Sequence, residues 1–209
     1  MLIETAFFYL SAVGTAVFAI SGALLGLRKG MDIVGVSFVA TVTGIGGGTI
    51  RDVLLGALPV AWVRNPTDIA ICIICAVVVS AFNKPLLGNR MAWLLYADAA
   101  GLALFAVLGA AKAESAGAHV LVAILFGAMS ACFGGIIRDI ITGEQPVIFA
   151  KEIYVSAALV AAGTFLLLPD TLGFDVRAIS GVAAGLALRL LAMRHEWTLP
   201  FPRYRPPES

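Results

Sequence analysis

Hydrophobic residues occur along the chain in seven long runs that are separated by short polar segments. The runs lie near residues 5–27, 32–58, 67–83, 92–112, 118–145, 152–169 and 176–194. A helix needs about 20 apolar residues to cross a hydrocarbon core of roughly 30 Å, and each run approaches or exceeds that length. We therefore predict an all-α integral membrane protein with seven transmembrane helices, built as a single membrane domain over residues 1–195 with a cytoplasmic tail over 196–209.

The first three runs are related in sequence to the next three. Residues 7–70 match residues 94–157 at 18 of 64 positions without a gap, at an offset of 87. Each repeat, about 5–83 and about 92–170, contains three predicted spans. Because three is an odd number, the second repeat must enter the membrane from the side opposite to the first. The pattern predicts a 3+3 inverted repeat followed by a seventh helix over 176–194.

Composition and charge agree with a membrane protein and indicate its orientation. The chain is 60% hydrophobic and 13% charged, with a mean hydropathy of +0.98, far more apolar than a soluble domain. Basic residues mark cytoplasmic loops. Nine lie on one predicted side, namely Arg28, Lys29, Lys84, Arg90, Lys151, Arg189, Arg194, Arg203 and Arg205, and three lie on the other, namely Arg64, Lys112 and Arg177. This predicts the inner membrane of a prokaryote, with the N-terminus outside and the C-terminus in the cytoplasm; the net charge of +1 argues against nucleic-acid binding.

Glycines interrupt the second and fifth runs at equivalent places. These two runs are the longest, and their middles hold Gly44, Gly46, Gly47 and Gly48 in the first repeat and Gly134 and Gly135 in the second. Glycine weakens a helix by about 1 kcal/mol per residue, and paired interrupted helices are a sequence sign of a transport site. We therefore predict that the second and fifth helices break at these glycines near the bilayer midplane.

A hydroxyl precedes each glycine group. Thr43 and Ser130 occupy equivalent positions, and two interpretations remain open for them. Each hydroxyl either lines a path together with carbonyls that the break sets free, or bonds the carbonyl of the preceding helical turn.

Five charged residues inside the runs need partners. Arg51-Asp52 and Arg138-Asp139 follow the glycines in the two repeats, and Asp98 has no acidic counterpart in the first repeat. A charge at the bilayer centre costs about 2.5–3.5 kcal/mol or more. Because adjacent residues on a helix do not face each other, we expect Arg51 and Asp139 to find partners on other helices, in a network that acts as a lock, a gate or both. Asp98 is expected either to attract cations to a mouth or to cap a helix.

Nothing in the sequence indicates an enzyme or a cofactor. There is no catalytic triad, phosphate-binding loop or cluster of His and Cys with metal-ligand spacing. The three cysteines, Cys72, Cys75 and Cys132, lie inside apolar runs and are interpreted as small packing residues.

The two Gly-Gly-x-x-Arg-Asp motifs, in an inverted three-helix repeat with a seventh helix, resemble the prokaryotic branch of the trimeric intracellular cation channel (TRIC) family. The resemblance covers about residues 5–195, and this bacterial group is also similar to what has been described as a glycine-transporter family. The resemblance implies a homotrimer in membrane lipid. Each protomer would hold its own pore around the second and fifth helices, with help from the first and fourth, and would conduct potassium or sodium ions.

The second repeat departs from the first where Phe133 replaces Gly46, so the two halves are not expected to bend identically. Three functions remain: a cation channel, which the resemblance favours; an alternating-access carrier for a small amino acid such as glycine, which inverted repeats also fit; and a non-conducting scaffold, which the buried charges disfavour.

Overall fold

The computed structural model describes residues 2–82, 90–149 and 152–198. The part of the predicted tail from residue 199 onward lies outside the described residues. The described residues form eight α-helices and two short 3-10 helices, and an isolated β-bridge joins Glu152 to Thr198. In chain order the helices are α1 (Leu2–Arg28), α2 (Ile33–Leu54), α3 (Ala61–Arg64), α4 (Thr67–Ala81), α6 (Arg90–Ser115), α7 (Val120–Ile141), η1 (Val147–Phe149), α8 (Val155–Leu167), η2 (Asp170–Leu172) and α9 (Gly173–Arg194).

Five of the described helices, α1, α2, α6, α7 and α9, are long and apolar enough to cross a membrane. The runs predicted near 67–83 and 152–169 form α4 and α8, which are apolar but have only 15 and 13 residues. Proline helps to set these shorter bounds: Pro66 precedes α4, and Leu168 after α8 is followed by Pro169, which disfavours helical backbone at the residue before it. In the part of the chain that the structure describes, five helices are thus long enough to span a membrane, and two shorter apolar helices lie where the other two spans were predicted.

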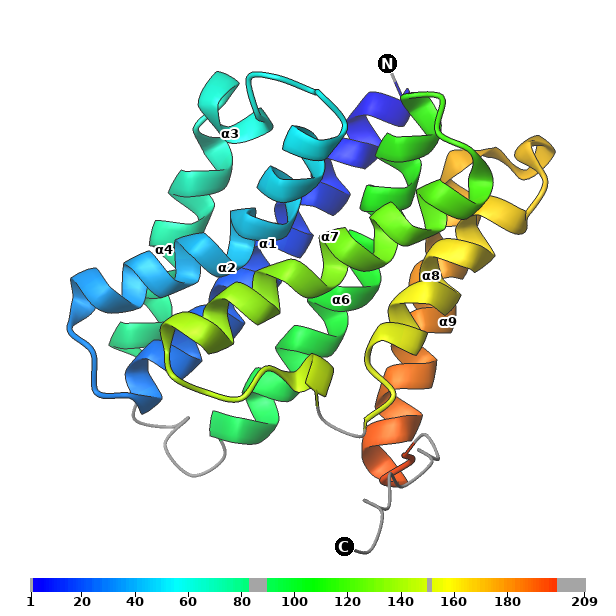
Figure 1. Cartoon of the computed structure of the whole chain (residues 1–209). Coiled ribbons are helices and arrows are strands. Elements are labelled where there is room, and N and C mark those ends of the chain that lie inside the picture. The colour runs from blue at the N-terminus through cyan, green and yellow to red at the C-terminus, as the bar shows by residue number, and fades with distance from the viewer. Residues whose placement is uncertain (1, 83–89, 150–151, 199–209) are drawn as a thin grey trace, which may run out of the picture.

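The sequence repeat is visible as a repeat of helices. At the offset of 87 the bounds of α2 coincide with those of α7, and α1 and α4 correspond to α6 and α8. Equivalent helices run in opposite directions: α1 descends from the N-terminal end of the molecule whereas α6 ascends to it, and α2 ascends whereas α7 descends (Figure 1). The repeat is therefore inverted, as predicted.

Equivalent residues of α1 and α6 meet across the axis that relates the two repeats. The rings of Phe18 and Phe105 are stacked with centroids 5.2 Å apart. A side chain at Gly14 would meet the Phe105 ring, and one at Gly101 would meet the Phe18 ring. Such mutual contacts are the mark of two-fold symmetry. The centre of the core is thus a self-complementary contact between the two halves.

The second and fifth apolar runs are longer than the helices α2 and α7 that they form, because each run continues into a turn. After α2, Gly56 has a φ of +67°, and after α7, Gly143 has a φ of +66°. In both turns the next amide donates to a carbonyl five residues back, Ala57 to Asp52 and Glu144 to Asp139, each at 2.8 Å. This left-handed C-terminal cap needs a residue without a Cβ. The extra apolar residues therefore lengthen the loop rather than the helix.

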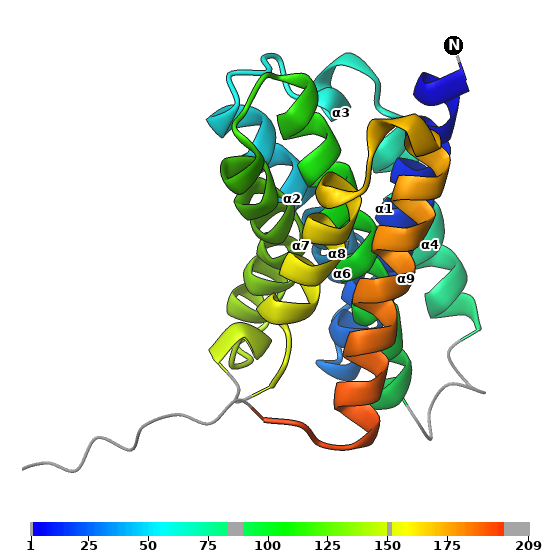
Figure 2. The same ribbon diagram turned by 90° about the vertical axis from the view of Figure 1, so that its right-hand side faces the viewer.

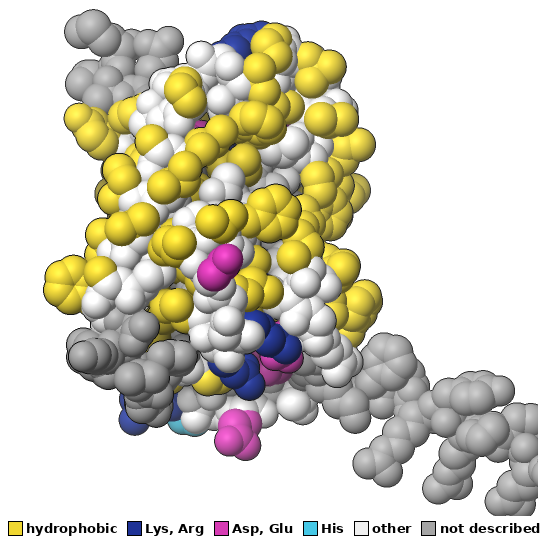
Figure 3. Space-filling model, turned by 90° about the vertical axis from the view of Figure 1, so that its left-hand side faces the viewer, with side chains coloured by type: hydrophobic (Ala, Val, Ile, Leu, Met, Phe, Trp, Pro, Cys, Tyr) yellow, Lys and Arg dark blue, Asp and Glu magenta, His cyan; other side chains and the backbone are white. Residues whose placement is uncertain are grey.

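α6 lies at the centre of the molecule and packs against α1, α7, α8 and α9. The antiparallel helices α8 and α9 lie side by side and cover one side of the molecule (Figure 2). Hydrophobic side chains cover most of the opposite side, where the charged ones lie mainly in the lower part of the view (Figure 3). A surface of this kind is the one that a membrane protein presents to lipid.

Candidate functional site

The two glycine groups lie inside continuous helices. α2 runs from Ile33 to Leu54 and α7 from Val120 to Ile141 without an interruption. The prediction that these helices are broken at their glycines is therefore wrong for this structure. Glycine only lowers helix propensity, and tertiary packing overrides that preference.

Close packing explains the glycines instead. A Cβ at Gly47 would collide with the main-chain carbonyl of Ser130, and a Cβ at Gly134 would collide with that of Thr43. The pair of contacts is again mutual, because Gly47 and Gly134 are equivalent residues, as are Thr43 and Ser130. Small residues allow helix backbones to approach in this way within membranes. α2 and α7 therefore touch backbone to backbone at the middle of the molecule.

The other glycines of the motif border different neighbours. A Cβ at Gly44 would lie 2.7 Å from the sulfur of Cys72 on α4, and one at Gly46 would lie 3.1 Å from Ile137 on α7. A Cβ at Gly48 would have more room, since its nearest neighbour is the Arg51 guanidinium at 3.6 Å. Gly135 faces the second charged cluster described below. Only part of the motif thus serves the contact between α2 and α7.

The two equivalent hydroxyls have different partners. Thr43 donates to the Val39 carbonyl at 2.6 Å, so this side chain bonds the preceding helical turn. The Ser130 hydroxyl accepts from Arg51 at 3.4 Å and joins α7 to the charged end of α2. Both residues are buried. Thr43 thus makes the bond to the preceding turn that was one of the alternatives, whereas the contact of Ser130 with Arg51 is neither of them; a role of these hydroxyls in lining a path stays a prediction.

The first charged cluster lies at the C-terminal end of α2. The Arg51 guanidinium donates to the carboxylate of its neighbour Asp52 at 2.9 Å. Lys112 of α6 binds both oxygens of the same carboxylate, at 2.7 and 2.8 Å. The Ala61 amide completes the shell of Asp52 at 3.3 Å. Arg51 and Asp52 are buried, whereas the Lys112 side chain keeps 26% of its surface exposed.

The second cluster lies at the end of α7. Arg138 donates to its neighbour Asp139 at 2.8 Å, and also to Asp98 of α6 at 2.6 Å and to Ser21 of α1 at 2.5 Å. The Val147 amide donates to Asp139 at 3.3 Å. All three charged side chains are at least 95% buried. A buried ion pair with such extra hydrogen bonds is strongly destabilised when one partner is removed.

The arrangement corrects three expectations. The ion-pair partner of Arg51 is the adjacent Asp52, and that of Asp139 is the adjacent Arg138, so neither residue pairs with an ion on another helix. The long arginine side chain folds back along its own helix and reaches a neighbour that a short side chain does not. Asp98 caps no helix, because it lies within α6 and binds Arg138 instead.

Lys112 and Ser21 take part in the clusters although the sequence did not single them out. Lys112 lies near the end of its apolar run, where a lysine normally extends to the membrane surface. Ser21 is a small polar residue within an apolar helix, and a single serine of this kind gives little indication in the sequence that it binds a charged group. These two residues and Asp98 also break the symmetry of the clusters: the counterpart of Lys112 is Leu25, and that of Asp98 is Ser11. Among directly paired side chains, the first cluster therefore carries one more positive charge than negative, and the second one more negative than positive.

Each cluster borders a cavity. A cavity of about 70 Å³ beside the first cluster is lined by Arg51, Asp52, Lys112 and Asp68, with Gly44 and Gly48 on its α2 wall. A larger cavity of about 280 Å³ beside the second is lined by Arg138, Asp139 and Glu144. The two clusters lie at the ends of α2 and α7 that point to opposite ends of the molecule (Figure 1).

An ion pair bridges two loops at the second cavity. Lys29, after α1, binds Glu144, after α7, at 2.9 Å. The Lys29 ammonium lowers the pKa of the Glu144 carboxyl by its hydrogen bond and its charge. Among the described residues no group of three or more His, Cys, Asp or Glu side chains is placed to hold a metal ion.

Comparison with known proteins identifies the family of the chain. The model of the family described as "Glycine transporter" matches residues 8–84 and 95–170, one match for each repeat. The UPF0126 membrane protein of Vibrio cholerae is 40% identical over 204 residues, covering 95% of this chain and 84% of that protein. The UPF0126 inner membrane protein YadS of Escherichia coli K12 is 38% identical over 202 residues, covering 94% of this chain and 95% of that protein.

The crystal structure of the TRIC trimeric intracellular cation channel orthologue from Rhodobacter sphaeroides has the same fold. Its TM-score is 0.87 at 41% identity, and the match covers 92% of this chain and all of that one. With the five long apolar helices, these relatives establish a bacterial inner-membrane protein. The chain therefore belongs to the glycine-transporter family of membrane proteins, whose solved relatives are prokaryotic TRIC cation channels.

Proposed function

We propose that the protein is a channel for monovalent cations that favours potassium over anions and has one conduction path in each copy of the chain. One observation carries the proposal: two cavities border charged clusters at the ends of α2 and α7, which point to opposite ends of the molecule, and α2 and α7 touch at their middles. The path would run between α1, α2, α6 and α7. The cation-channel activity of the TRIC relatives supports this assignment.

The contact between α2 and α7 at the middle of the molecule would have to change for the proposed path to open. α2 and α7 must separate or bend where Gly47 and Gly134 meet the opposite carbonyls. Glycine makes this stretch the weakest part of each helix, by about 1 kcal/mol per residue. Carbonyls freed there would replace part of the hydration shell of a passing cation.

The charged clusters would form the two mouths of the path. Asp52 and Asp139 each hold one carboxylate oxygen against an arginine and the other near a loop amide. Lys112 neutralises Asp52 in the closed structure, so a cation that enters has to displace its ammonium group. We propose that Asp98 and Asp139 concentrate cations at the opposite mouth.

The proposed assembly is a homotrimer in the lipid bilayer, as in the TRIC channels. All seven apolar helices would cross the membrane, with α4 and α8 as the short spans. The excess of basic residues at one end supports a topology with the C-terminus in the cytoplasm and the N-terminus outside.

Planar-bilayer recording of the purified protein in a potassium chloride gradient tests the proposal. We expect discrete current steps whose reversal potential follows potassium. Asp52→Asn should weaken the selectivity for potassium over chloride, whereas Asp175→Asn, at an exposed site on α9, should leave it unchanged. Reversal at the chloride potential would reject cation selectivity.

A carrier for a small amino acid is the second candidate, since a closed centre between two half-cavities in an inverted repeat also fits alternating access. Saturable uptake of labelled glycine into proteoliposomes, together with silent bilayers, would establish the carrier and reject the channel.

A further inference from the structure

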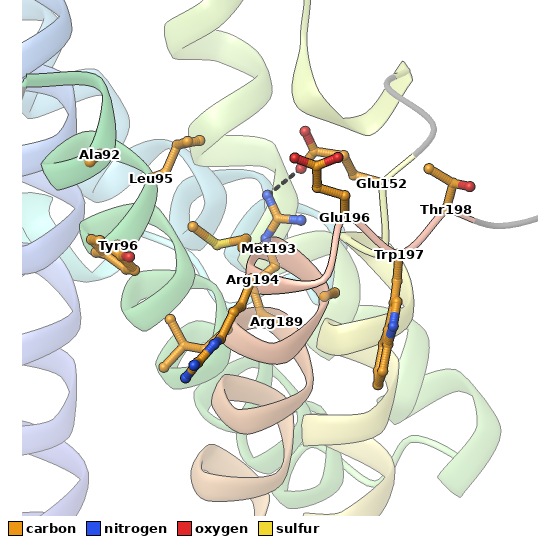
Figure 4. A pocket seen from close by; sticks show the side chains of 12 residues that line it. Ala92, Leu95, Tyr96, Glu152, Arg189, Met193, Arg194, Glu196, Trp197 and Thr198 are labelled. Atoms are coloured by element: carbon orange, nitrogen blue, oxygen red, sulfur yellow. Dashed lines mark ion pairs between the residues drawn. The ribbon is translucent and has the colours of Figure 1, made fainter.

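A third cavity lies away from both charged clusters. Its volume is about 800 Å³, within the range of small-molecule sites. One wall is the first turns of α6 and the other is the last turns of α9, and the segment after α9 closes it where Thr198 bridges to Glu152 (Figure 4). Its lining residues lie at the end of the molecule where α9 ends (Figure 1).

The lining has an apolar part and a polar part. Leu95 of α6 and Leu190 and Met193 of α9 supply apolar side chains. Tyr96 and Trp197 stand at the rim, with 53% and 44% of their surfaces exposed. Tyrosine and tryptophan in such positions mark the level of lipid headgroups. A molecule that fits here has a polar head and an apolar chain.

The polar part carries both signs of charge. Arg189 and Arg194 line the cavity together with Glu152 and Glu196. In Figure 4 the carboxylates of Glu152 and Glu196 lie near the Arg189 guanidinium, whereas Arg194 extends away from them. A ligand with one sign of charge would meet an unfavourable partner here. A zwitterion finds a partner for each of its charges.

Arg189 holds the inner end of the polar part. Only 1% of the residue is exposed; it binds Glu152 at 2.7 Å and the Ile153 carbonyl at 3.1 Å, and it lies over the Tyr154 ring. Its Nε is fully buried, so the residue positions the Glu152 carboxylate at the cavity and does not contact a ligand through that nitrogen.

We propose that this cavity binds a zwitterionic membrane phospholipid of the phosphoethanolamine type. The phosphate oxygens accept from Arg194, and the headgroup ammonium donates to Glu196 and Glu152. The first acyl carbons lie against Leu95, Leu190 and Met193. Phosphatidylglycerol shares the phosphate but has no ammonium group, and free O-phosphoethanolamine has no acyl chain. Comparing the binding of the three ligands therefore separates the contribution of the ammonium group from that of the acyl chain.

Native mass spectrometry of the detergent-purified full chain, titrated with each of the three ligands, tests the proposal. We expect one phosphatidylethanolamine per chain to bind at least about tenfold more tightly than the other two, because each charge-assisted hydrogen bond and the buried chain add affinity. Arg194→Gln and Glu196→Gln should each lose about tenfold. Arg64→Gln, an exposed arginine at the opposite end, is the matched control and should lose nothing.

Fluorescence gives a second measurement that does not depend on detergent. Brominated phosphatidylethanolamine in vesicles should quench Trp197 when Trp62 and Trp93 are replaced by phenylalanine, and Arg194→Gln should reduce that quenching. Equal binding of both lipids, equal binding of free O-phosphoethanolamine, or variants that bind like the wild type would each overturn the proposal.

Discussion

At the residue scale, neighbouring positions of one motif have opposite tolerance for a methyl group. A Cβ added at Gly47 would collide with the Ser130 carbonyl, whereas one added at Gly48 would meet the Arg51 guanidinium only at 3.6 Å. Both substitutions to alanine raise helix propensity by about 1 kcal/mol. The two substitutions differ in the space that the new methyl group finds outside the helix. Comparing their stabilities therefore separates the effect of packing from that of helix propensity.

We expect Gly47→Ala to destabilise the protein by about 1–3 kcal/mol, the usual cost of overpacking, and Gly48→Ala to be neutral or stabilising. Thermal unfolding in detergent measures both. Equal melting temperatures for the two variants would show that the backbone contact of α2 with α7 contributes nothing to stability.

The buried Arg138 allows a second test. Asp98→Asn removes one of its two carboxylate partners, and breaking a buried pair costs about 3–5 kcal/mol. The double variant Asp98→Asn, Arg138→Gln also leaves the buried Asp139 without its arginine, so its loss should differ from the sum of the two single losses by the coupling between Asp98 and Arg138. Chemical unfolding of the single and double variants measures the coupling, with the exposed Asp175→Asn as the control. Additive losses would mean that the two residues do not interact.

Sequence reasoning succeeded where a pattern extends over many residues. The seven apolar runs and the offset of 87 gave the helices and the inverted repeat, because hydrophobic periodicity and duplication leave a signal at many positions. It failed at single residues. A glycine in the sequence is compatible with either a helix break or a close contact between helices. The role of Gly47 therefore depends on where Ser130 lies in the folded structure. The rule that adjacent helix residues do not face each other ignores the length of a flexible side chain. Arg51 reaches Asp52 because its side chain is long enough to fold back along the helix.

At the element scale, the loops after α1 and α7 are joined by the pair of Lys29 and Glu144, whose side chains are 33% and 35% exposed. The pKa of Glu144 is lowered from its model-compound value of 4.5 by Lys29. A carboxyl with a lowered pKa in the folded state contributes stability above its unfolded pKa, and that stability is lost as pH falls through the folded pKa.

We therefore expect the wild type to melt slightly higher than Glu144→Gln at pH 7, and the difference to vanish toward pH 3. Salt should reduce the difference as well, because exposed pairs are screened. Melting curves of both proteins across this range are the measurement. A gap that grew on acidification would rule out the ion pair as its source.

At the scale of the whole molecule, the inverted repeat fixes which loops share a side of the membrane. Ala116, between α6 and α7, and Gln145, after α7, are both exposed and lie at opposite ends of the molecule. We expect Ala116→Cys to react with a membrane-impermeant maleimide in intact cells, and Gln145→Cys to react only in inverted vesicles. The native cysteines are replaced by alanine for this experiment. The opposite labelling pattern would reverse the proposed topology.

Duplication has preserved packing and let charge diverge. The contacts of Gly14 with Phe105, Gly101 with Phe18, and Gly47 and Gly134 with the opposite carbonyls all occur in mutual pairs. Lys112 and Asp98 have no charged counterparts. Two antiparallel halves with identical charges would give a path that conducts equally in both directions. With a lysine beside one mouth and an additional carboxylate beside the other, the path is electrically polar, so a conducting form of this protein should rectify.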